Sequence, residues 1–420
     1  MGRVFIIYIL LLLLYGASGC SGSANNPVEP DQEPSQPVGS IPEVIEPDII
    51  IESQAEKISQ LTGDYDRERE EPTQNRTFLR YRLQATDLGV PFEDGERTWI
   101  LFGDTWGDVG AARDAIAYTT DTDAEDGLDL EFISDENGVY LPINIPGITQ
   151  AAFEVPTEGL MIDDQMYIYH TTDHSPPVTM GRSVLARASD IESAEFSYLY
   201  DFSTSKFINI SIVKGVSPDW AHSAQLQERL PGNDEEALII FGSGAYRESY
   251  VYLAHQPVSG IEDRHTVQYF AGLDEENEPL WSAAESNARP LFALDTPCVG
   301  EFSVSYNTFI DRWIMLYNCG NPRGINLRTS EHPWGPWTKP QIVFRPWEDG
   351  GYCHFIHTSW EFDQCDELHD AGREYEWGGE YGPYQFEHLA TGDAQSTTIY
   401  FTLSTWNPYA VILMKARLKK

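Results

Sequence analysis

The sequence predicts an all-β protein built as a five-bladed β-propeller. Three observations favour this fold. Few stretches show the 3.6-residue apolar period of a helix, short apolar runs alternate with turn-forming residues, and one pattern of runs recurs five times. The five strongest runs are RTWILFGD, DQMYIYHT, EALIIFGS, DRWIMLYN and STTIYFTL, which begin at Arg97, Asp164, Glu236, Asp311 and Ser396.

The spacing of these runs indicates one domain rather than two. Each run is followed by a second strand-like run and in most cases by a third, so that a unit recurs about every 70 to 85 residues. Repeated units of three or four antiparallel strands are typical of propellers. One small twisted sheet cannot bury both of its faces, whereas five sheets packed around an axis bury them all. We therefore expect a single propeller domain at residues 57–420, with a pair of β-sandwiches as the alternative.

The N-terminus is typical of a secretory signal. Arg3 supplies a basic start, residues 4–14 are almost wholly apolar, and small residues precede Cys20. This ending resembles a bacterial lipobox, so we expect residues 1–20 to be a lipoprotein signal peptide and Cys20 to be lipidated. A plain signal peptide and an uncleaved anchor are the alternatives, but the apolar run is short for a membrane span. Ser21, after the cysteine, favours the outer membrane.

Composition indicates which segment is disordered and which classes of partner are excluded. Residues 21–56 are rich in Pro, Glu, Ser and Asn, and we expect a disordered tether there. The net charge of −39, from 66 acidic and 27 basic residues, argues against a nucleic-acid partner, because nucleic-acid binding needs a basic surface. We expect a monomer outside the cell that is attached to a membrane only through its lipid.

Four cysteines remain besides Cys20, and an exported protein permits disulfides. The spacings favour the pairs Cys298–Cys319 and Cys353–Cys365, although four cysteines allow three pairings. A zinc site is the competing interpretation, but no Cys-x-x-Cys motif occurs. We expect no bound metal and no cofactor.

An ionisable residue lies just before each strong run, where the innermost strand of each blade is expected. The segments LQATDLGV, FEVPTEGLMI, WAHSAQL, VGEFSVSY and YQFEHLAT contribute Asp87, Glu158, His222, Glu301, and Glu387 or His388. Because the innermost strands of a propeller line one axial channel, we expect these side chains to share a pocket. An axial ion held by His222 or His388 is an alternative that the sequence leaves open.

Asp87 and Asp104 are the strongest candidates for catalysis. Asp87 lies on the first inner strand, and Asp104 follows Gly103 at the end of the next strand. A turn at residues 93–96 joins the two strands and brings both carboxylates toward one face. Paired carboxylates in a partly dehydrated cleft suit glycoside hydrolysis, in which one donates a proton and the other acts as nucleophile or base. Either aspartate could instead be a turn residue that hydrogen-bonds the backbone.

Five further residues are candidates for the same site. Glu301 lies in an apolar strand, where a charge is expected only if it faces a channel, and it is a third catalytic candidate. Trp106 offers a flat apolar surface on which a sugar ring can stack. Glu158, His222 and His388 are expected to contact substrate. The alternative for Glu158 is a plain turn, and for the histidines it is packing along the channel.

Several motifs together resemble a known family. They are TDLGVP, LFGDTWG, VPTEG, GEFSVSYN, SEHPWGPW and WNPYAVILMKARL, within residues 76–420. These motifs resemble domain of unknown function family four-one-eight-five (DUF4185), which includes endo-D-arabinanases, five-bladed propeller glycoside hydrolases that cleave D-arabinofuranose polymers. The first two motifs are the specific ones, whereas GPW segments recur in many sugar-acting propellers. The resemblance implies that Asp87 and Asp104 are the catalytic carboxylates.

Three functions are compatible with the sequence. The one we favour is a cell-surface glycoside hydrolase acting on a furanoside-type, D-arabinan-like polysaccharide, with Asp104 as nucleophile or base and Asp87 as acid or modulator, although the sequence does not assign these roles. The second is a non-catalytic glycan-binding lipoprotein, in which Arg113 or Arg182 would lock Asp104 in a salt bridge. The third is a protein-interaction propeller with a blocked channel and an apolar surface patch.

Overall fold

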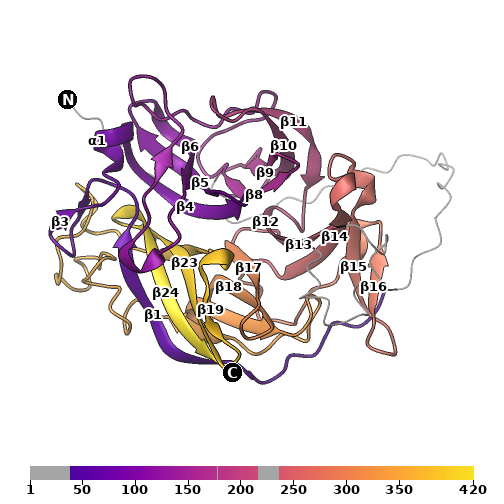
Figure 1. Ribbon diagram of the computed structural model, residues 1–420. Coiled ribbons are helices and arrows are strands. Elements are labelled where there is room, and N and C mark those ends of the chain that lie inside the picture. Colours follow the sequence, from indigo (N-terminus) through magenta and orange to yellow (C-terminus); the bar gives the residue numbers. More distant parts are fainter. Residues whose placement is uncertain (1–37, 177, 216–235) are drawn as a thin grey trace, which may run out of the picture. The chain divides into compact units, whose positions relative to one another are not determined.

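The computed structural model describes residues 38–176, 178–215 and 236–420. The described chain is all-β, and its main strands form five sheets of four or five strands around a common centre, as predicted (Figure 1). Two predicted site residues, Cys20 and His222, lie outside the described residues. Within the described ranges, no helix has the length and apolar character needed to cross a membrane.

The first four blades are antiparallel sheets whose strands follow chain order. Blade one contains β4 (Leu83–Glu93), β5 (Thr98–Gly107), β6 (Gly110–Thr119) and β7 (Glu131–Phe132). Blade two contains β8 (Pro156–Ile162), β9 (Gln165–Thr172), β10 (Arg182–Asp190) and β11 (Glu195–Ser203). Blade three contains β12 (Asn209–Lys214), β13 (Ala237–Ser243), β14 (Val251–Pro257), β15 (Gln268–Leu273) and β16 (Pro279–Ser282). Blade four contains β17 (Phe302–Asn307), β18 (Arg312–Gly320), β19 (Arg323–Ser330) and β20 (Gln341–Phe344).

Blade five joins the two ends of the described chain. Its strands are β21 (Glu380–Gln385), β23 (Ser396–Trp406), β24 (Tyr409–Lys419) and, at the outer edge, β1 (Ile50–Gln60), and the short β22 (Thr391–Asp393) also pairs with β23. β1 runs antiparallel to β24, from the pair Ile50–Lys419 to the pair Gln60–Ile412 (Figure 1). The N-terminal strand therefore covers an edge that β24 would otherwise expose.

The predicted tether extends too far into the chain. Residues 50–56 belong to β1, and the segment before them also packs on the blades. The Gly39 amide donates to the Ala271 carbonyl at 2.8 Å, and Arg312 Nη2 lies 2.6 Å from Asp48 Oδ2. Composition did not predict this strand, because the outermost strand of a blade is half exposed and needs few apolar residues. Only two of the eleven residues in β1 are buried.

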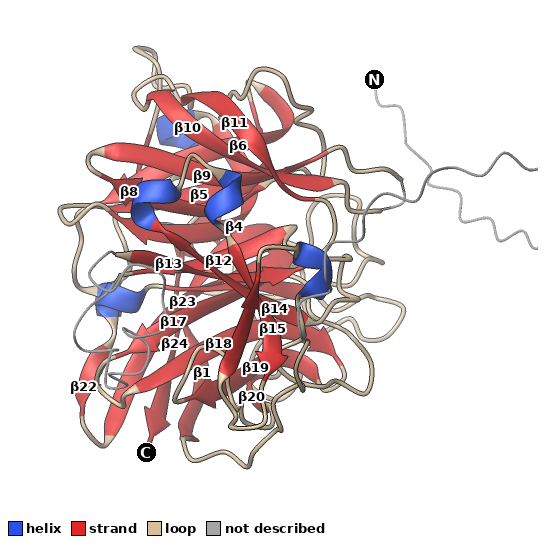
Figure 2. Cartoon of the chain, turned by 90° about the vertical axis from the view of Figure 1, so that its right-hand side faces the viewer, coloured by secondary structure: helices blue, strands red, loops and turns tan. Residues whose placement is uncertain are grey.

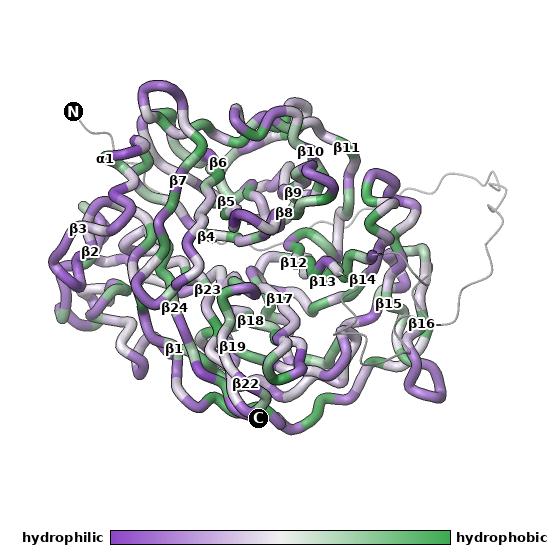
Figure 3. Tube along the Cα trace, viewed as in Figure 1, coloured by the Kyte–Doolittle hydropathy of each residue, from purple (hydrophilic) through white to green (hydrophobic). Residues whose placement is uncertain are grey.

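The hydrophobic core lies between neighbouring blades. Five clusters of buried side chains each join neighbouring sheets. Between blades three and four, for example, the ring centroids of Phe241 and Trp313 lie 5.9 Å apart. Every residue of β13 is buried, because both faces of its sheet are covered. This explains why the sequence shows continuous apolar runs, which Figure 3 displays as hydrophobic stretches along the strands.

The five innermost strands, β4, β8, β12, β17 and β21, contact one another in sequence around a closed ring. Figure 2 labels β4, β8, β12 and β17 of this ring in a view turned by 90°. Blade three differs from the prediction. Its inner strand is Asn209–Lys214, which precedes the segment predicted there, and His222 itself lies outside the described residues. In blade five, β21 ends at Gln385, so Glu387 and His388 lie in the short 3-10 helix η5 (Glu387–Leu389).

Two disulfides and a few short elements complete the described structure. Cys298 pairs with Cys319 and Cys353 with Cys365, which are the pairs that the spacings favour, with Cα–Cα distances of 5.2 and 5.5 Å. The second disulfide lies in the long connection between β20 and β21. The remaining elements are β2 (Tyr65–Asp66), β3 (Glu71–Pro72), α1 (Thr77–Tyr81), and the 3-10 turns η1 (Ala124–Asp126), η2 (Val258–Gly260), η3 (Arg264–Thr266) and η4 (Glu285–Asn287).

Candidate active site

A cavity of about 420 Å³ lies at one end of the axial channel and receives residues from all five blades. Asp87, Asp104 and Glu301 all line it. The structure thus brings together the three residues that the sequence predicts to be catalytic, although they come from blades one and four.

This cavity lies at the N-terminal ends of the inner strands. Asn209 is the first residue of β12 and Tyr381 the second residue of β21, and both line it. A second cavity, of about 290 Å³, is lined by the C-terminal ends of the same strands, including Glu93 of β4 and Lys214 of β12. The inner strands therefore all run in the same direction along the axis, and the channel has two chemically different mouths.

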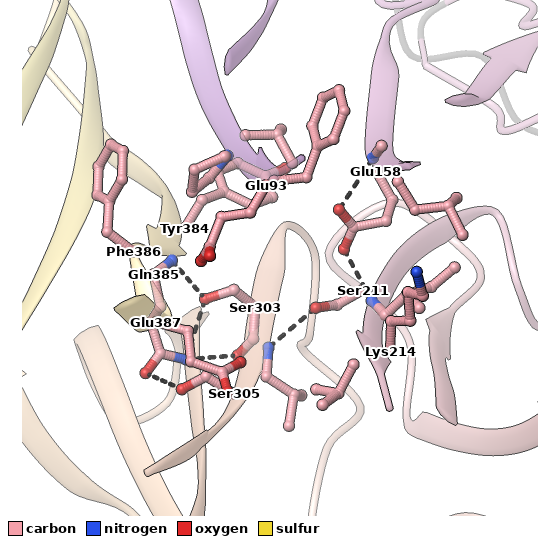
Figure 4. Close-up of a pocket in the computed structure, with 18 of the residues that line it drawn as sticks. Glu93, Glu158, Ser211, Lys214, Ser303, Ser305, Tyr384, Gln385, Phe386 and Glu387 are labelled. Carbon is pink, nitrogen blue, oxygen red and sulfur yellow. Dashed lines mark hydrogen bonds between the residues drawn. The ribbon is translucent and has the colours of Figure 1, made fainter. Parts of the chain in front are cut away.

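Glu158 and His388 belong to the second cavity and do not join the three acids, contrary to the shared pocket that the sequence predicts. Figure 4 shows Glu158 beside β12, where its carboxylate accepts hydrogen bonds from the amides of Ile212 and Gly159 at 2.7 and 2.9 Å. Burial raises the pKa of Glu158 to about 8. His388 Nδ1 lies 2.8 Å from Glu93 Oε1. Sequence pattern identified the strands, but it does not give the height of a side chain along the axis.

Irregular pairing of β4 with β5 aims the two aspartates into the first cavity. The register shifts on both sides of Asp87, which lies opposite Gly103. Such bulges commonly redirect side chains near active sites. Leu88 and Asp104 have φ angles of 66° and 40°, in the left-handed region that residues other than glycine rarely adopt. A Cβ on Gly103 would lie 2.7 Å from Val155 Cγ1 and 3.0 Å from Asp87 Oδ1, so only glycine fits between the strands.

Asp87 is buried, with 6% of its surface exposed. The Tyr381 hydroxyl donates to its Oδ2 at 2.8 Å, whereas Oδ1 is buried and has no hydrogen-bond partner among the described residues. Burial raises the pKa of Asp87 to about 6, against the opposing effect of hydrogen bonds from Tyr409 and Tyr381.

Asp104 has the more strongly perturbed carboxyl group. Burial, followed by the negative charges of Asp87 and Asp114, raises its pKa to about 8. The backbone amide of Phe153 donates to both carboxyl oxygens, at 3.1 and 3.0 Å, and orients the group. Since the two aspartates interact, they titrate as a pair, and near pH 7 the pair holds about one proton, mainly on Asp104.

Glu301 is held in a two-pronged ion pair. Nε and Nη2 of Arg247 lie 3.2 and 3.3 Å from the two carboxylate oxygens of Glu301. Burial is the largest single effect on the pKa of Arg247 and lowers it, but the charge and hydrogen bonds of Glu301, together with the nearby Tyr246 and Tyr381, outweigh burial and leave that pKa above its usual value. The guanidinium also lies 5.4 Å from the Tyr381 ring centroid. Glu301 thus places a fixed charge pair at the wall of the cavity, while no ion pair holds Asp104 among the described residues.

A comparison with family models identifies the fold family. The model described as Domain of unknown function (DUF4185) matches residues 72–415, which include every carboxylate of the first cavity. The chain belongs to this family. Among curated proteins, none matches the sequence.

Several solved structures of sugar-acting enzymes are similar to this DUF4185 chain at low identity. An exo-β-1,3-galactanase from Phanerochaete chrysosporium with β-1,3-galactotriose aligns at 7% identity and a TM-score of 0.43, over 86% of this chain and 64% of its own length. A GH43_1 enzyme from Xanthomonas citri aligns at 12% identity and a TM-score of 0.40, over 79% of this chain and 87% of its own. A glycosyl hydrolase from Bacteroides ovatus aligns at 10% identity and a TM-score of 0.40, over 91% of this chain and 95% of its own.

The DUF4185 cavity is supported by a buried pair that sequence reasoning missed. Asp114 Oδ1 accepts a hydrogen bond from the Asp104 amide at 3.2 Å, and its Oδ2 lies 2.8 Å from His170 Nε2. His170 Nδ1 lies 2.7 Å from the Thr171 carbonyl, which can only accept, so Nδ1 carries hydrogen. A neutral His170 with hydrogen on Nδ1 has only a lone pair on Nε2, and a carboxylate oxygen also only accepts. A further proton must therefore lie between His170 Nε2 and Asp114 Oδ2. The signal available in the sequence was a lone acid in the apolar strand of RDAIAY.

Trp106 does not line the first cavity, and 52% of its surface is exposed. It lines a neighbouring cavity of about 790 Å³ on the DUF4185 domain. Asp104, Phe153 and Trp406 line both cavities, so the perturbed carboxyl group of Asp104 stands where the two meet. Trp106 is thus placed for contact with an extended ligand rather than with the group nearest Asp87.

The groups of possible metal ligands in the described residues contain no residue that lines the first cavity. One contains Cys353, Cys365 and Asp366, but its two sulfurs form a disulfide. The other contains His357, Asp366 and His369, and it lies in the connection before β21.

Proposed function

We propose that this protein is a glycoside hydrolase that cleaves a furanoside-type polysaccharide, of which D-arabinan is the first candidate. The observation that carries the proposal is the placement of Asp87 and Asp104 in one cavity with pKa values raised to about 6 and about 8. Two carboxyl groups of which one is protonated and one ionised at neutral pH are what glycosidic bond cleavage requires.

The order of the two pKa values supports Asp104 as the acid and Asp87 as the base or nucleophile, which is the reverse of the order first favoured from the sequence. Asp104, which holds the proton near pH 7, donates it to the glycosidic oxygen as the C–O bond breaks. Asp87, largely ionised, stabilises or attacks the positively charged anomeric carbon, or removes a proton from the water that attacks it. That water supplies the hydroxyl of the new reducing end and releases one proton. Asp104 takes this proton where Asp87 attacks or stabilises the anomeric carbon, and where Asp87 is the base the proton passes from Asp87 to Asp104 through solvent.

The surrounding residues support binding of a sugar chain. The Arg247–Glu301 pair offers both charged donors and acceptors to sugar hydroxyl groups. The two cavities that meet at Asp104 leave room for sugar units on both sides of a cleaved bond. Trp106 and Trp406, both partly exposed, provide rings for stacking against the C–H faces of sugars.

The glycan-binding alternative receives less support. That hypothesis expects one acid of the site to be tied up in a salt bridge, and Asp104 locked by Arg113 or Arg182 would favour it. Arg182 instead pairs with Asp173 and Asp201, and the carboxyl group of Asp104 accepts from a backbone amide. A protein-interaction propeller with a blocked channel is likewise disfavoured, because the first cavity is open and lined with acids.

The test is release of reducing ends by the full chain from a panel of polysaccharides led by D-arabinan and L-arabinan. Wild type is compared with Asp104→Asn and Asp87→Asn, and with Asp135→Asn, which changes an acid in an exposed turn, as the control. We expect product from wild type and control, and a rate at least about 100-fold lower from the other two variants. A folded wild type that binds a glycan but cleaves none would move the protein to the glycan-binding class.

We also propose that Cys20 anchors the protein to the bacterial outer membrane through a lipid. The support is the signal-like N-terminus that ends in small residues and cysteine. Cys20→Ala should release the protein from the membrane fraction and prevent labelling by a radioactive fatty acid. Membrane association that persists in this variant without a label would contradict the lipid anchor.

A further inference from the structure

The connection between β20 and β21, residues 345–379, is the longest link between two blades in the described chain. It contributes Trp377, Gly378 and Gly379 to the wall of the first cavity. One disulfide, Cys353–Cys365, cross-links residues in its first half. The second half has no disulfide, so its position against the cavity depends on other contacts.

Two histidines and an aspartate converge inside this connection. One ligand atom from each of His357, Asp366 and His369 lies within 4.8 Å of the others. The side chains of His357 and Asp366 are 0% and 2% exposed. The imidazole rings of the two histidines lie 5.0 Å apart. Two imidazoles and one carboxylate form the donor set that zinc and neighbouring divalent metals prefer.

The hydrogen bonds around His357 leave its second nitrogen facing an acceptor. Its Nε2 lies 2.9 Å from the Glu374 carbonyl and donates to it. Nδ1 contacts an oxygen of Asp366. A neutral His357 would then direct a lone pair at a carboxylate, so either a proton lies between the two atoms or the contact opens to admit a cation. An imidazole that donates one N–H to a backbone carbonyl is oriented as metal-ligating histidines usually are.

His369 independently indicates a ligand at this cluster. Its Nδ1 is buried and has no hydrogen-bond partner among the described residues, whereas buried polar atoms in folded proteins are nearly always paired. Asp366 is meanwhile oriented by the amides of Thr358 and Leu368, at 3.0 and 3.1 Å. A shared proton satisfies His357 and Asp366 but leaves His369 unused, whereas a metal ion uses all three.

We propose that His357, Asp366 and His369 bind a divalent transition-metal ion of the zinc class, with water as the fourth ligand. The role of the ion is structural. The backbone of His357 accepts from the Gly378 amide at 2.9 Å and donates to the Asn407 carbonyl at 2.9 Å. Binding at His357 therefore holds the part of the connection that forms the cavity wall, and the proposal stands whether or not the cavity is hydrolytic.

The test measures metal binding on the full chain, purified without a histidine tag and treated with a chelator. Zn²⁺ is titrated by calorimetry, Co²⁺ is added separately to record its visible absorption, and the thermal midpoint is measured with and without Zn²⁺. The variants are His369→Ala, Asp366→Asn and, as a matched control, His354→Ala, which removes an exposed histidine of the same connection.

We expect wild type and His354→Ala to bind about one Zn²⁺, to give the intense Co²⁺ absorption of a four-coordinate site, and to melt at a higher temperature with zinc. The affinity of His369→Ala should be at least about tenfold lower. If Asp366→Asn does not fold, the zinc affinity of His369→Ala and the Co²⁺ spectrum of wild type still test whether the three residues bind a metal ion. A folded wild type that binds no zinc, or equal binding by wild type and His369→Ala, overturns the proposal and leaves a shared proton between His357 and Asp366.

Discussion

The Tyr381 hydroxyl donates a hydrogen bond of 2.8 Å to Oδ2 of Asp87, across 294 residues of sequence. Asp87 lies on the inner strand of blade one and Tyr381 on that of blade five, so the bond spans the junction where the ring closes. It favours the ionised form of Asp87 and opposes the effect of burial on its pKa. The charge of the carboxylate proposed to act on the anomeric carbon thus depends on the packing of two blades.

Removing this hydrogen bond should shift the pH dependence of hydrolysis. In Tyr381→Phe the pKa of Asp87 should rise above about 6, so that the acidic limb of the kcat/KM profile moves up by about one pH unit. Tyr167→Phe is the matched control, because it removes a 2.9 Å hydrogen bond to Glu262 away from the cavity. An acidic limb that stays in place in Tyr381→Phe would show that Asp87 does not govern it.

Asp104→Asn should change how stability depends on pH. The folded-state pKa of Asp104 is raised from 3.8 to about 8, so its contribution to stability is fully present below about pH 4 and is lost as the pH rises through about 8. Asparagine cannot ionise, so the variant does not lose this contribution. The thermal midpoint of the variant minus that of wild type should therefore increase from pH 5 to pH 9.

Asp393→Asn is the control for this measurement. Hydrogen bonds from the backbone lower the pKa of Asp393, so its contribution changes only in acid, and the difference from wild type should stay constant from pH 5 to pH 9. The prediction for Asp104 is contradicted if both variants follow the same pH course.

Breaking the Arg247–Glu301 pair from one side should be more harmful than removing both charges. Arg247→Gln leaves the nearly buried Glu301 carboxylate without its partner, which should cost about 1–3 kcal/mol of unfolding free energy in urea titrations. In Arg247→Gln/Glu301→Gln part of this loss should return, because no uncompensated charge remains. Costs of the two single changes that simply add in the double variant would indicate no coupling.

Removing β1 should weaken the whole propeller. A chain without residues 1–60 loses the edge strand that pairs with β24, together with the buried side chains of Ala55 and Ile58. We expect its thermal midpoint to fall by about 5 °C or more. A chain without residues 1–37 retains β1 and should melt like the full chain. Equal melting of both shortened chains would show that closure by β1 adds no stability.

Much of the fold could be predicted from sequence because its signals are local. Runs such as EALIIFGS from Glu236 are continuous and apolar since each blade is covered on both faces, and their five-fold recurrence indicates a propeller. The family motifs around Asp87 and Asp104 predicted two acids that do share a cavity. The strand β1 escaped prediction because an exposed edge strand leaves little apolar pattern.

The candidate site could be predicted only in part, for a geometrical reason. A pattern of strands shows which residues can face the channel, but it contains no coordinate along the channel axis. Glu158 and Glu301 were therefore grouped together, although one lies at the C-terminal mouth and the other at the N-terminal mouth. Arg247 was missed because it follows the end of β13, outside any inner strand.

The sequence by itself determined the all-β class, the five repeats, the favoured disulfide pairs and the identity of the acids most worth testing, because periodicity, spacing and motif are properties of short segments. Tertiary structure alone decided that β1 closes blade five, that Tyr381 and Asp114 set the surroundings of the two aspartates, and that His357 meets His369. These relationships arise when strands distant in sequence pack against one another, and burial then changes the pKa values on which the proposed chemistry depends.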